Sequence, residues 1–368
     1  MAEEYQRQTK PRPTKASVGD GAGKLVDAIR EDIETVIANL GGVSFEGMTI
    51  LVTGGAGFLG SWICQTLVEQ NARVICLDNL SSGLRTNVAS LLDRSNFKFV
   101  EHDITEPVHI GETVDMVMHL ASRASPLEFE GFALEILSAN TLGTWGALEI
   151  ARKSGARFVF ASTSEVYGDP SLVPTPESYW GNVNPIGPRG CYDEAKRCGE
   201  AYAMAYHRQH NLDVRIGRIF NTYGPRMRAD GIYGRVVPRL VDQALRGEPL
   251  TVFGTGQQTR SFCYITDQVE GLLRLASLPQ ANGEVVNIGN DEEVRIMDLA
   301  EAIRKLTDSC SEIIFQPVPQ DDPKRRCPDI SKAKRILGWK PRVGLEEGLT
   351  KTINWFKRQE LESASETC

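Results

Sequence analysis

One tyrosine and one lysine in the middle of the chain have the spacing of an acid–base pair. Tyr192 and Lys196 lie four residues apart in the stretch CYDEAKR, so on a helix both side chains project from one face. An ammonium beside a phenol favours the phenolate and lowers the tyrosine pKa, which suits the tyrosine to accept a hydroxyl proton. The pair alone is weak evidence, because the same spacing arises by chance on many amphipathic helices.

A glycine-rich segment near the start of the chain has the spacing of a phosphate-binding turn. Gly54, Gly57 and Gly60 recur every third residue, directly after the apolar run TILVTG and before a helical stretch. Such glycines let the backbone approach a pyrophosphate, whose charge then lies at the helix N-terminus. Asp78 ends the next apolar run, where its carboxylate can accept ribose hydrogen bonds and repel a 2′-phosphate. The combination predicts a site for NAD rather than NADP; the alternative is a purely structural strand–helix turn.

The elements that must position these residues alternate between short apolar runs and helical stretches. Consecutive apolar positions indicate strands that are buried on both faces, as crossover helices require. This pattern predicts an α/β fold, a Rossmann-type doubly wound parallel sheet with a smaller C-terminal α/β substrate-binding region. The expected strands cover residues 49–54, 73–78, 97–103, 114–121, 157–163 and 213–220.

The N-terminal part of the chain precedes the first motif and is therefore expected to be an appendage, whose helix packs on its own domain or, as the alternative, contacts a second subunit. It begins with a polar segment, and apolar residues then recur every three or four positions up to Gly41-Gly42. Every candidate site residue follows this part, so its removal is expected to leave turnover intact. The proposed divisions are a flexible arm at 1–22, an amphipathic helical appendage at 23–47, an NAD-binding domain at 48–222, a mainly nucleotide-sugar-binding region at 223–358 and a tail at 359–368.

Composition excludes several other kinds of protein. The 368 residues are 41% hydrophobic and carry a formal net charge of −7, which allows a large core and gives no basic field for nucleic acid. The eight cysteines form no C-x-x-C pair, which argues against a metal site and favours a reducing, cytoplasmic setting. No stretch approaches the roughly 20 apolar residues that span a bilayer, so no membrane partner is expected.

The glycine spacing and the Y-x-x-x-K motif together resemble the extended short-chain dehydrogenase/reductase superfamily, from about Met48 to Arg358. The resemblance implies that Asp103 meets the adenine amino group and that the segment HLAS lies beneath the cofactor's ribose and phosphates. The implied NAD contacts are Gly54, Gly57, Phe58, Leu59, Asp78, Asn79, Asp103, Ile104, Leu120, Ala121, Ser122, Tyr192 and Lys196.

The pair Ser164-Glu165, at the end of the expected strand 157–163, resembles that of UDP-glucuronate decarboxylases. Sugar 4,6-dehydratases have Asp-Glu there, UDP-galactose 4-epimerases have small or hydroxylated residues, and UDP-apiose synthases begin with Cys. Long segments such as NTYGPRM and DDPKRRCPD also resemble the decarboxylases, whereas residues 122–141 depart from their pattern after Ser125-Pro126. The implied catalytic residues are Thr163, Ser164, Glu165, Tyr192 and Lys196, and the implied substrate contacts are Arg189, Asn221, Arg260, Arg326 and Asp329.

The resemblance implies decarboxylation of UDP-glucuronate to UDP-xylose through a 4-keto sugar, with NAD recycled, by a homodimer formed through helices at 136–153 and 191–209. Two alternatives use the same scaffold, a UDP-sugar 4-epimerase and a UDP-apiose/xylose synthase. A third is a catalytically silent protein that senses NAD or a nucleotide-sugar. Ser164-Glu165 argues against the first two, and the intact Thr163, Tyr192 and Lys196 argue against the third.

Overall fold

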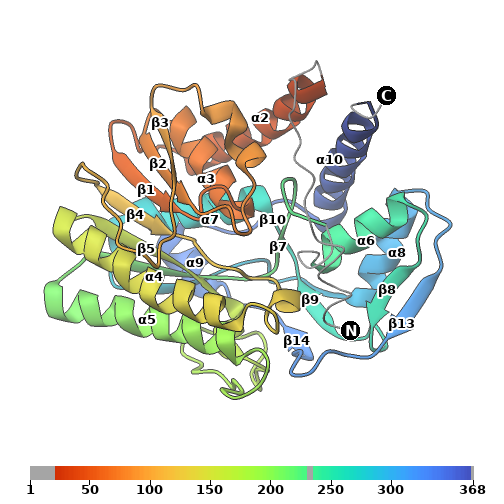
Figure 1. The fold of residues 1–368 in the computed structure, drawn as a ribbon. Coiled ribbons are helices and arrows are strands. Elements are labelled where there is room, and N and C mark those ends of the chain that lie inside the picture. Colours follow the sequence, from red (N-terminus) through yellow and green to blue (C-terminus); the bar gives the residue numbers. More distant parts are fainter. Residues whose placement is uncertain (1–20, 230–234, 366–368) are drawn as a thin grey trace.

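A seven-stranded parallel sheet forms the centre of the computed structural model, which describes residues 21–229 and 235–365 (Figure 1). Its spatial order is β11-β6-β5-β4-β1-β2-β3, so the order reverses between β1 and β4. Parallel α/β sheets bind ligands beside such a reversal, at the carboxyl ends of the strands. The predicted Rossmann-type fold is confirmed. The strands are β1 (Thr49–Thr53), β2 (Arg73–Asp78), β3 (Phe97–Glu101), β4 (Met116–His119), β5 (Arg157–Thr163), β6 (Val214–Ile219) and β11 (Val285–Ile288).

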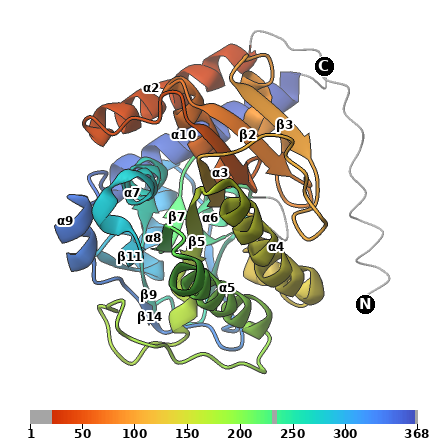
Figure 2. The same cartoon turned by 90° about the vertical axis from the view of Figure 1, so that its left-hand side faces the viewer.

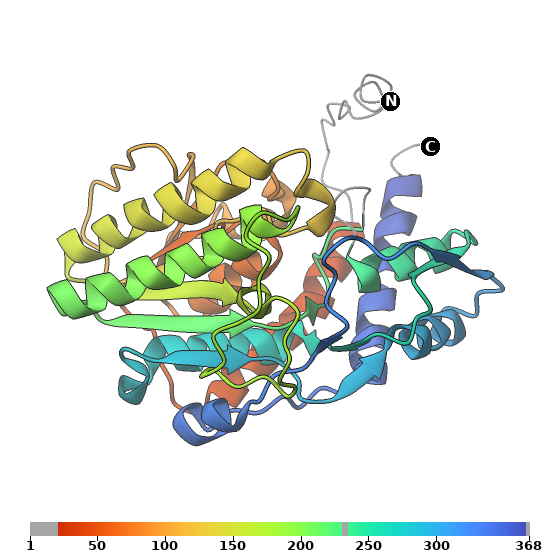
Figure 3. The ribbon, with the colours of Figure 1, turned by 90° about the horizontal axis from the view of Figure 1, so that it is seen from below.

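Both faces of the sheet are buried, which explains the consecutive apolar residues in its strands. On β1, Ile50 and Val52 belong to one core cluster, whereas Leu51 belongs to the other. The helices α4 (Ala133–Ser154) and α5 (Gly190–His210) lie together on one face of the sheet (Figure 3). The other face carries α3 (Phe58–Glu69) and α7 (Ile265–Ser277).

The sheet extends beyond the boundary expected at residue 222. Strand β11 comes from the C-terminal part of the chain and pairs in parallel with β6, with Val285 opposite Ile216 and Ile288 opposite Ile219. The helix α7 also packs on β6, so residues 223–358 contribute one strand and one helix to the nucleotide-binding fold. The sequence pattern missed β11 because a run of four residues has too little periodicity to distinguish a strand.

The remaining C-terminal elements form the expected smaller α/β region, at the right of Figure 1. Three short strand sets build it, and three helices pack around them, whereas a fourth packs on β11 and α7 of the nucleotide-binding fold. The strand sets are β8 (Leu250–Phe253) with β13 (Ile313–Gln316), β10 (Cys263–Tyr264) with β7 (Thr222–Tyr223), and β12 (Glu293–Arg295) with β9 (Thr259–Ser261) and β14 (Arg325–Arg326). The three helices are α6 (Val236–Leu245), α8 (Ile296–Leu306) and α10 (Leu345–Ser365), and the fourth is α9 (Ser331–Leu337).

The N-terminal helix α2 (Gly21–Leu40) is part of the core, which corrects the expectation of an appendage. Ile33, Val36 and Leu40 are at most 1% exposed, and the helix packs against α7, α10 and α3 (Figure 2). The buried Asp32 accepts hydrogen bonds from the Tyr264 hydroxyl at 2.6 Å and the Lys351 ammonium at 2.7 Å. The helix also includes the end of the expected arm, whereas residues 1–20 lie outside the described part. Most of the expected tail is helical, since α10 continues to Ser365.

Candidate active site

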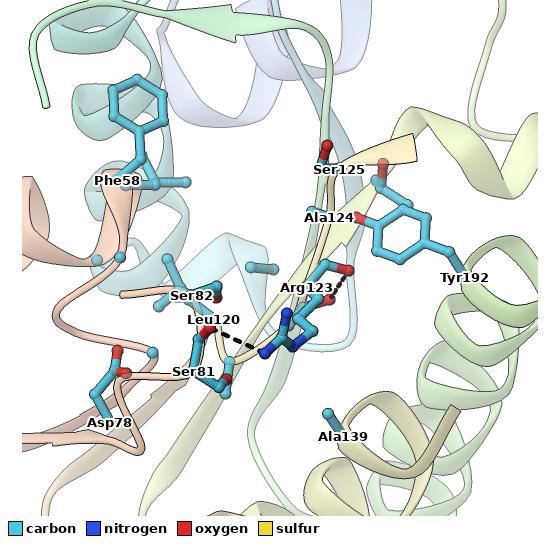
Figure 4. A pocket seen from close by; sticks show the side chains of 18 of the residues that line it. Phe58, Asp78, Ser81, Ser82, Leu120, Arg123, Ala124, Ser125, Ala139 and Tyr192 are labelled. Carbon is cyan, nitrogen blue, oxygen red and sulfur yellow. Dashed lines mark hydrogen bonds between the residues drawn. The ribbon is translucent and has the colours of Figure 1, made fainter. Parts of the chain in front are cut away.

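A cavity of about 680 Å³ lies at the carboxyl ends of the central strands, beside the reversal of strand order. Asp78 and Phe58 lie on one side of it and Tyr192 on the other, with Leu120 and Arg123 between them (Figure 4). The cavity brings together many residues that sequence analysis singled out. They are Gly54, Gly57, Phe58, Leu59, Asp78, Asn79, Asp103, Ile104, Leu120, Ala121, Ser122, Thr163, Ser164, Glu165, Tyr192, Lys196 and Asn221.

The three glycines have different structural roles in the turn between β1 and α3. Gly54 has a φ of 70°, and a Cβ there would lie 2.7 Å from the backbone of Ala121. A Cβ at Gly60 would lie 2.1 Å from the carbonyl oxygen of Gly54, so this glycine allows the helix to pack on the turn. Gly57 lines the cavity and precedes α3, whose N-terminus has no side-chain cap. The turn therefore fits a dinucleotide pyrophosphate placed at the start of a helix.

Asp78 is held in a fixed orientation at the end of β2. Its carboxylate oxygens accept hydrogen bonds from the backbone N–H groups of Ala56, at 2.9 Å, and Leu80, at 2.8 Å. Burial raises the pKa of Asp78, although these N–H groups oppose the shift. The next residue, Asn79, donates to the Asp103 carboxylate at 2.8 Å. The polar groups expected at the adenosine end of the cofactor are thus oriented by the chain itself.

Tyr192 and Lys196 lie near one another on α5, in buried surroundings. The Lys196 ammonium donates to the Ala161 carbonyl at 2.8 Å and lies 6.0 Å from the centre of the Tyr192 ring. Burial raises the pKa of Tyr192 to about 12, and the opposing influences are the charge of Arg235 and a hydrogen bond with Thr163. Burial also lowers the pKa of Lys196 to about 7. The spacing alone suggested that Lys196 lowers the pKa of Tyr192. In the structure, burial has the larger effect, so the pKa of Tyr192 is raised instead.

Glu165 is clamped by two arginines from distant parts of the chain. Arg326 donates two hydrogen bonds to its carboxylate, both of 2.6 Å, and Arg189 donates one of 2.5 Å. Burial acts to raise the pKa of Glu165, but the two guanidinium charges outweigh it and lower the pKa to about 2. Glu165 is therefore ionised at neutral pH.

The predicted substrate contacts divide into two groups. Asn221 lines the main cavity and donates to the Ser261 carbonyl at 3.1 Å. Arg189 and Arg326 reach the cavity only through Glu165, which occupies their guanidinium groups. Arg260 lies opposite Arg326 in the register of β9 and β14 and donates to Asp322 at 2.8 Å. Asp329 accepts the N–H of Ser331 at 2.8 Å and does not line the main cavity.

The NAD dependent epimerase/dehydratase family model matches residues 50–289. The chain belongs to this family. UDP-glucuronic acid decarboxylase 1 of Danio rerio is 49% identical over 311 residues, which cover 84% of this chain and 73% of that protein. UDP-glucuronic acid decarboxylase 6 of Arabidopsis thaliana is 49% identical over 303 residues, which cover 82% of this chain and 87% of that protein.

A solved structure extends the comparison within the epimerase/dehydratase family. The UDP-glucuronic acid 4-epimerase of Bacillus cereus, in complex with UDP-glucuronic acid and NAD, has a TM-score of 0.75 and 32% sequence identity. The match covers 85% of this chain and all of that chain. NAD, the cofactor in the family's description, is the one that the glycine turn and Asp78 predict.

Sequence analysis of this epimerase/dehydratase family member missed several charged residues at the cavity. Arg123 forms a buried ion pair with Glu128 and donates to the Ser81 carbonyl at 2.9 Å. Arg235 donates to the Ala124 carbonyl at 2.8 Å, close enough to Tyr192 to affect its pKa. Arg123 and Glu128 fall in the segment that departs from the decarboxylase pattern, so no motif indicated them.

Within residues 21–229 and 235–365, no helix is long and apolar enough to cross a membrane.

Proposed function

We propose that the chain is an NAD-dependent UDP-glucuronate decarboxylase that produces UDP-xylose through a 4-keto sugar. The observation that carries this proposal is the ionised Glu165, held by Arg189 and Arg326 beside Thr163 and Tyr192. In the arginine cluster around Glu165, the three guanidinium groups of Arg189, Arg260 and Arg326 face the paired carboxylates of Glu165 and Asp322, and this surplus of positive charge suits a sugar that carries its own carboxylate. Curated relatives named UDP-glucuronic acid decarboxylase, which match more than four fifths of this chain, support the same reaction.

The first part of the proposed mechanism creates a ketone at C4 of the sugar. Bound NAD, held by the glycine turn and Asp78, would supply the hydride acceptor and later the hydride donor. Tyr192 takes the C4 hydroxyl proton, and Thr163 holds the reacting oxygen by a hydrogen bond. The nearby Arg235 places positive charge close to the phenol, which favours loss of its proton. Lys196, 6.0 Å from the ring centre, would add to this effect when it is protonated.

The second part uses the ketone as an electron sink. The C6 carboxylate is then β to the C4 carbonyl, so carbon dioxide leaves as its bonding electrons pass into an enolate. Thr163 and Tyr192 stabilise the enolate oxygen by hydrogen bonding. The low pKa of Glu165 suits it, together with Ser164, to orient the ring and disfavours it as the acid that protonates C5. A proton from solvent adds to C5 and restores the ketone. Return of hydride to C4, and of a proton from Tyr192 to its oxygen, then completes UDP-xylose.

Product analysis distinguishes this function from C4 epimerisation, which the Bacillus cereus neighbour makes the second candidate. The protein is incubated with NAD and UDP-glucuronate, and carbon dioxide and nucleotide-sugars are quantified. We expect carbon dioxide and UDP-xylose in equal amounts, with no net accumulation of NADH. A six-carbon C4 epimer without carbon dioxide would replace the proposal with the epimerase. Ring-contracted UDP-apiose would indicate the apiose/xylose synthase, and binding without any product would indicate a sensor.

We also propose a homodimer formed through the outer face of α4 and α5. The two helices pack side by side (Figure 3), and both carry exposed apolar side chains. An exposed apolar patch of this kind is typical of an interaction surface. The residues that support it are Leu137, Leu142, Trp145 and Tyr202. A cytoplasmic location, also proposed, agrees with the unpaired buried cysteines Cys64 and Cys263.

A further inference from the structure

A second cavity, of about 230 Å³, lies behind the arginine cluster of the active site. Arg189 separates the two cavities, because it lines the second one while its guanidinium group donates to Glu165, which lines the first. Asn182, Asn184 and Asp321 are exposed residues of the second cavity. This cavity therefore connects solvent to the side of the arginine cluster that faces away from the main cavity.

Asp193 is a buried carboxylate at this second cavity, and no role was assigned to it above. It follows Tyr192 on α5 and lies one helical turn after Arg189. The residue is 3% exposed, and its Oδ2 atom lies 3.8 Å from Nε of Arg189. Its buried Oδ1 atom has no hydrogen-bond partner among the described residues. A buried carboxylate oxygen without a partner destabilises the charged form, so this geometry favours a protonated Asp193.

The protonation state of Asp193 determines the net charge of the arginine cluster. The guanidinium groups of Arg189, Arg260 and Arg326 face only two firmly paired carboxylates, those of Glu165 and Asp322. A neutral Asp193 leaves one positive charge in surplus, whereas an ionised Asp193 cancels it. An anionic sugar carboxylate bound nearby would therefore favour the protonated form.

The groups around Asp193 have opposing effects on its pKa. Burial and the negative charge of Glu165 raise its pKa to about 8, whereas the positive charges of Arg189 and Arg326 oppose the shift. Charged and titratable groups face Asp193 from its own helix, from the segment after β5, from β14 and from the walls of the second cavity. They are Arg189, Glu194, Glu165, Arg326, Asp169, Asp321 and Asp322.

We propose that Asp193 takes up a proton from solvent when UDP-glucuronate binds, and so leaves the arginine cluster with a positive charge for the sugar carboxylate. Asp193 acts through Arg189 and is thus a positioning residue for substrate. The inference rests on the proposed function, because it requires a substrate that carries a carboxylate. The proton returns to solvent when the neutral-sugar product leaves, so uptake and release balance over one turnover.

Proton uptake can be measured directly by calorimetry. UDP-glucuronate is titrated into NAD-loaded Tyr192→Phe protein, which prevents turnover, in two buffers of different ionisation enthalpy at about pH 8, near the pKa of Asp193. We expect uptake of a substantial fraction of one proton per site. UDP-xylose, which lacks the carboxylate, should give much less uptake. At pH 6, where Asp193 is already protonated, the uptake should be lost.

Variants at two positions of the second cavity test whether the proton goes to Asp193. Asp193→Asn in the same background should abolish the uptake at pH 8, whereas the matched Asp321→Asn change should leave it intact, because Asp321 belongs to the same cavity and is exposed. Equal uptake in the Asp193→Asn protein would assign the proton to another group, such as Lys196, and overturn the inference.

Two further results keep the inference separate from the proposed function. If Asp193→Asn does not fold, Asp193→Ser in the same background replaces it, because Lys196, whose pKa is lowered to about 7, would also lose its uptake at pH 6. Uptake that is absent at pH 8 or unchanged at pH 6 in the protein with Asp193 contradicts the inference. Carbon dioxide release by the unmodified protein is measured beside it. Release without uptake at Asp193 overturns the inference alone, whereas no release and no binding of UDP-glucuronate overturns both.

Discussion

In the proposed mechanism, the first chemical step depends on Tyr192. Its hydroxyl is hydrogen-bonded to Thr163, and burial holds its pKa high in the absence of ligands. Tyr192→Phe removes the proton acceptor but keeps the ring that stacks on Phe129 at 5.2 Å between ring centres. We expect turnover to fall by a factor on the order of 10²–10⁴, the usual effect of losing a general base, with no transient NADH absorbance. NADH formation at the wild-type rate would remove Tyr192 from this role.

In the proposed mechanism, Glu165 acts in the later step, after the ketone has formed. Glu165→Gln keeps the shape of the side chain but removes the charge that pairs with Arg189 and Arg326. Tyr192, Lys196 and the glycine turn stay intact, so transient NADH should still appear on addition of UDP-glucuronate, while carbon dioxide release becomes much slower. Stopped-flow absorbance with product quantification measures both. Undiminished carbon dioxide release would show that Glu165 has no part in decarboxylation.

Arg260 is expected to act in the same step, but through its neighbour. It pairs with Asp322 and lies opposite Arg326 on the adjacent strand, so its loss changes the charge around the arginine that holds Glu165.

The motif residues of the cavity were predicted from sequence because each follows a strand end or shares a helix face. The clamp on Glu165 was not predicted, since Arg189 and Arg326 lie 24 and 161 residues away and sequence spacing cannot pair such residues.

Asp78 should determine the choice of cofactor. Its carboxylate is fixed by the N–H groups of Ala56 and Leu80 at the cavity wall, where a 2′-phosphate would meet an unscreened negative charge. Calorimetric titration of the unmodified protein should therefore give much tighter binding of NAD than of NADP. Asp78→Asn should reduce the difference in affinity between NAD and NADP. Equal affinity of the unmodified protein for the two dinucleotides would contradict the assignment.

At the scale of elements, α2 is the feature that sequence analysis placed least well. The spacing of its apolar residues correctly predicted an amphipathic helix, yet it could not show which surface that face covers. The structure places the helix against α7 and α10 and ties it to Tyr264 and Lys351 through Asp32. Removal of residues 1–42 would therefore expose core side chains, so we no longer expect the shortened protein to remain fully stable and active.

A matched pair of substitutions in α2 tests this conclusion without deleting the helix. Ile33 is 1% exposed in the main core cluster, whereas the side chain of Arg30 on the same helix is 71% exposed. Ile33→Ala should lower the free energy of unfolding by about 2–5 kcal/mol, as large-to-small core substitutions do. Arg30→Ala should change it by less than about 0.5 kcal/mol. Denaturant unfolding measures both, and equal effects would mean that α2 is peripheral after all.

At the scale of the whole molecule, the chain has one outer face whose composition differs from that of an ordinary surface. The helices α4 and α5 lie against the sheet (Figure 1), yet they also carry exposed large apolar residues. The sequence indicated both helices, and the family resemblance suggested that they pair between subunits. Sequence pattern alone could not separate the residues of α4 that face the sheet from those that face outward, because α4 carries large apolar residues on both its buried and its exposed sides.

A charge placed on this face should separate the subunits. Leu142 on α4 is 56% exposed, and Leu172, in a loop outside the two helices, is 50% exposed. Leu142→Glu would bury an unpaired carboxylate in the proposed interface, which is strongly unfavourable, whereas Leu172→Glu would leave its carboxylate in water. Sedimentation velocity should show a dimer for the unmodified protein and for Leu172→Glu, and a monomer for Leu142→Glu. A dimer that persists in Leu142→Glu would place the interface elsewhere, and a monomeric unmodified protein would refute the dimer itself.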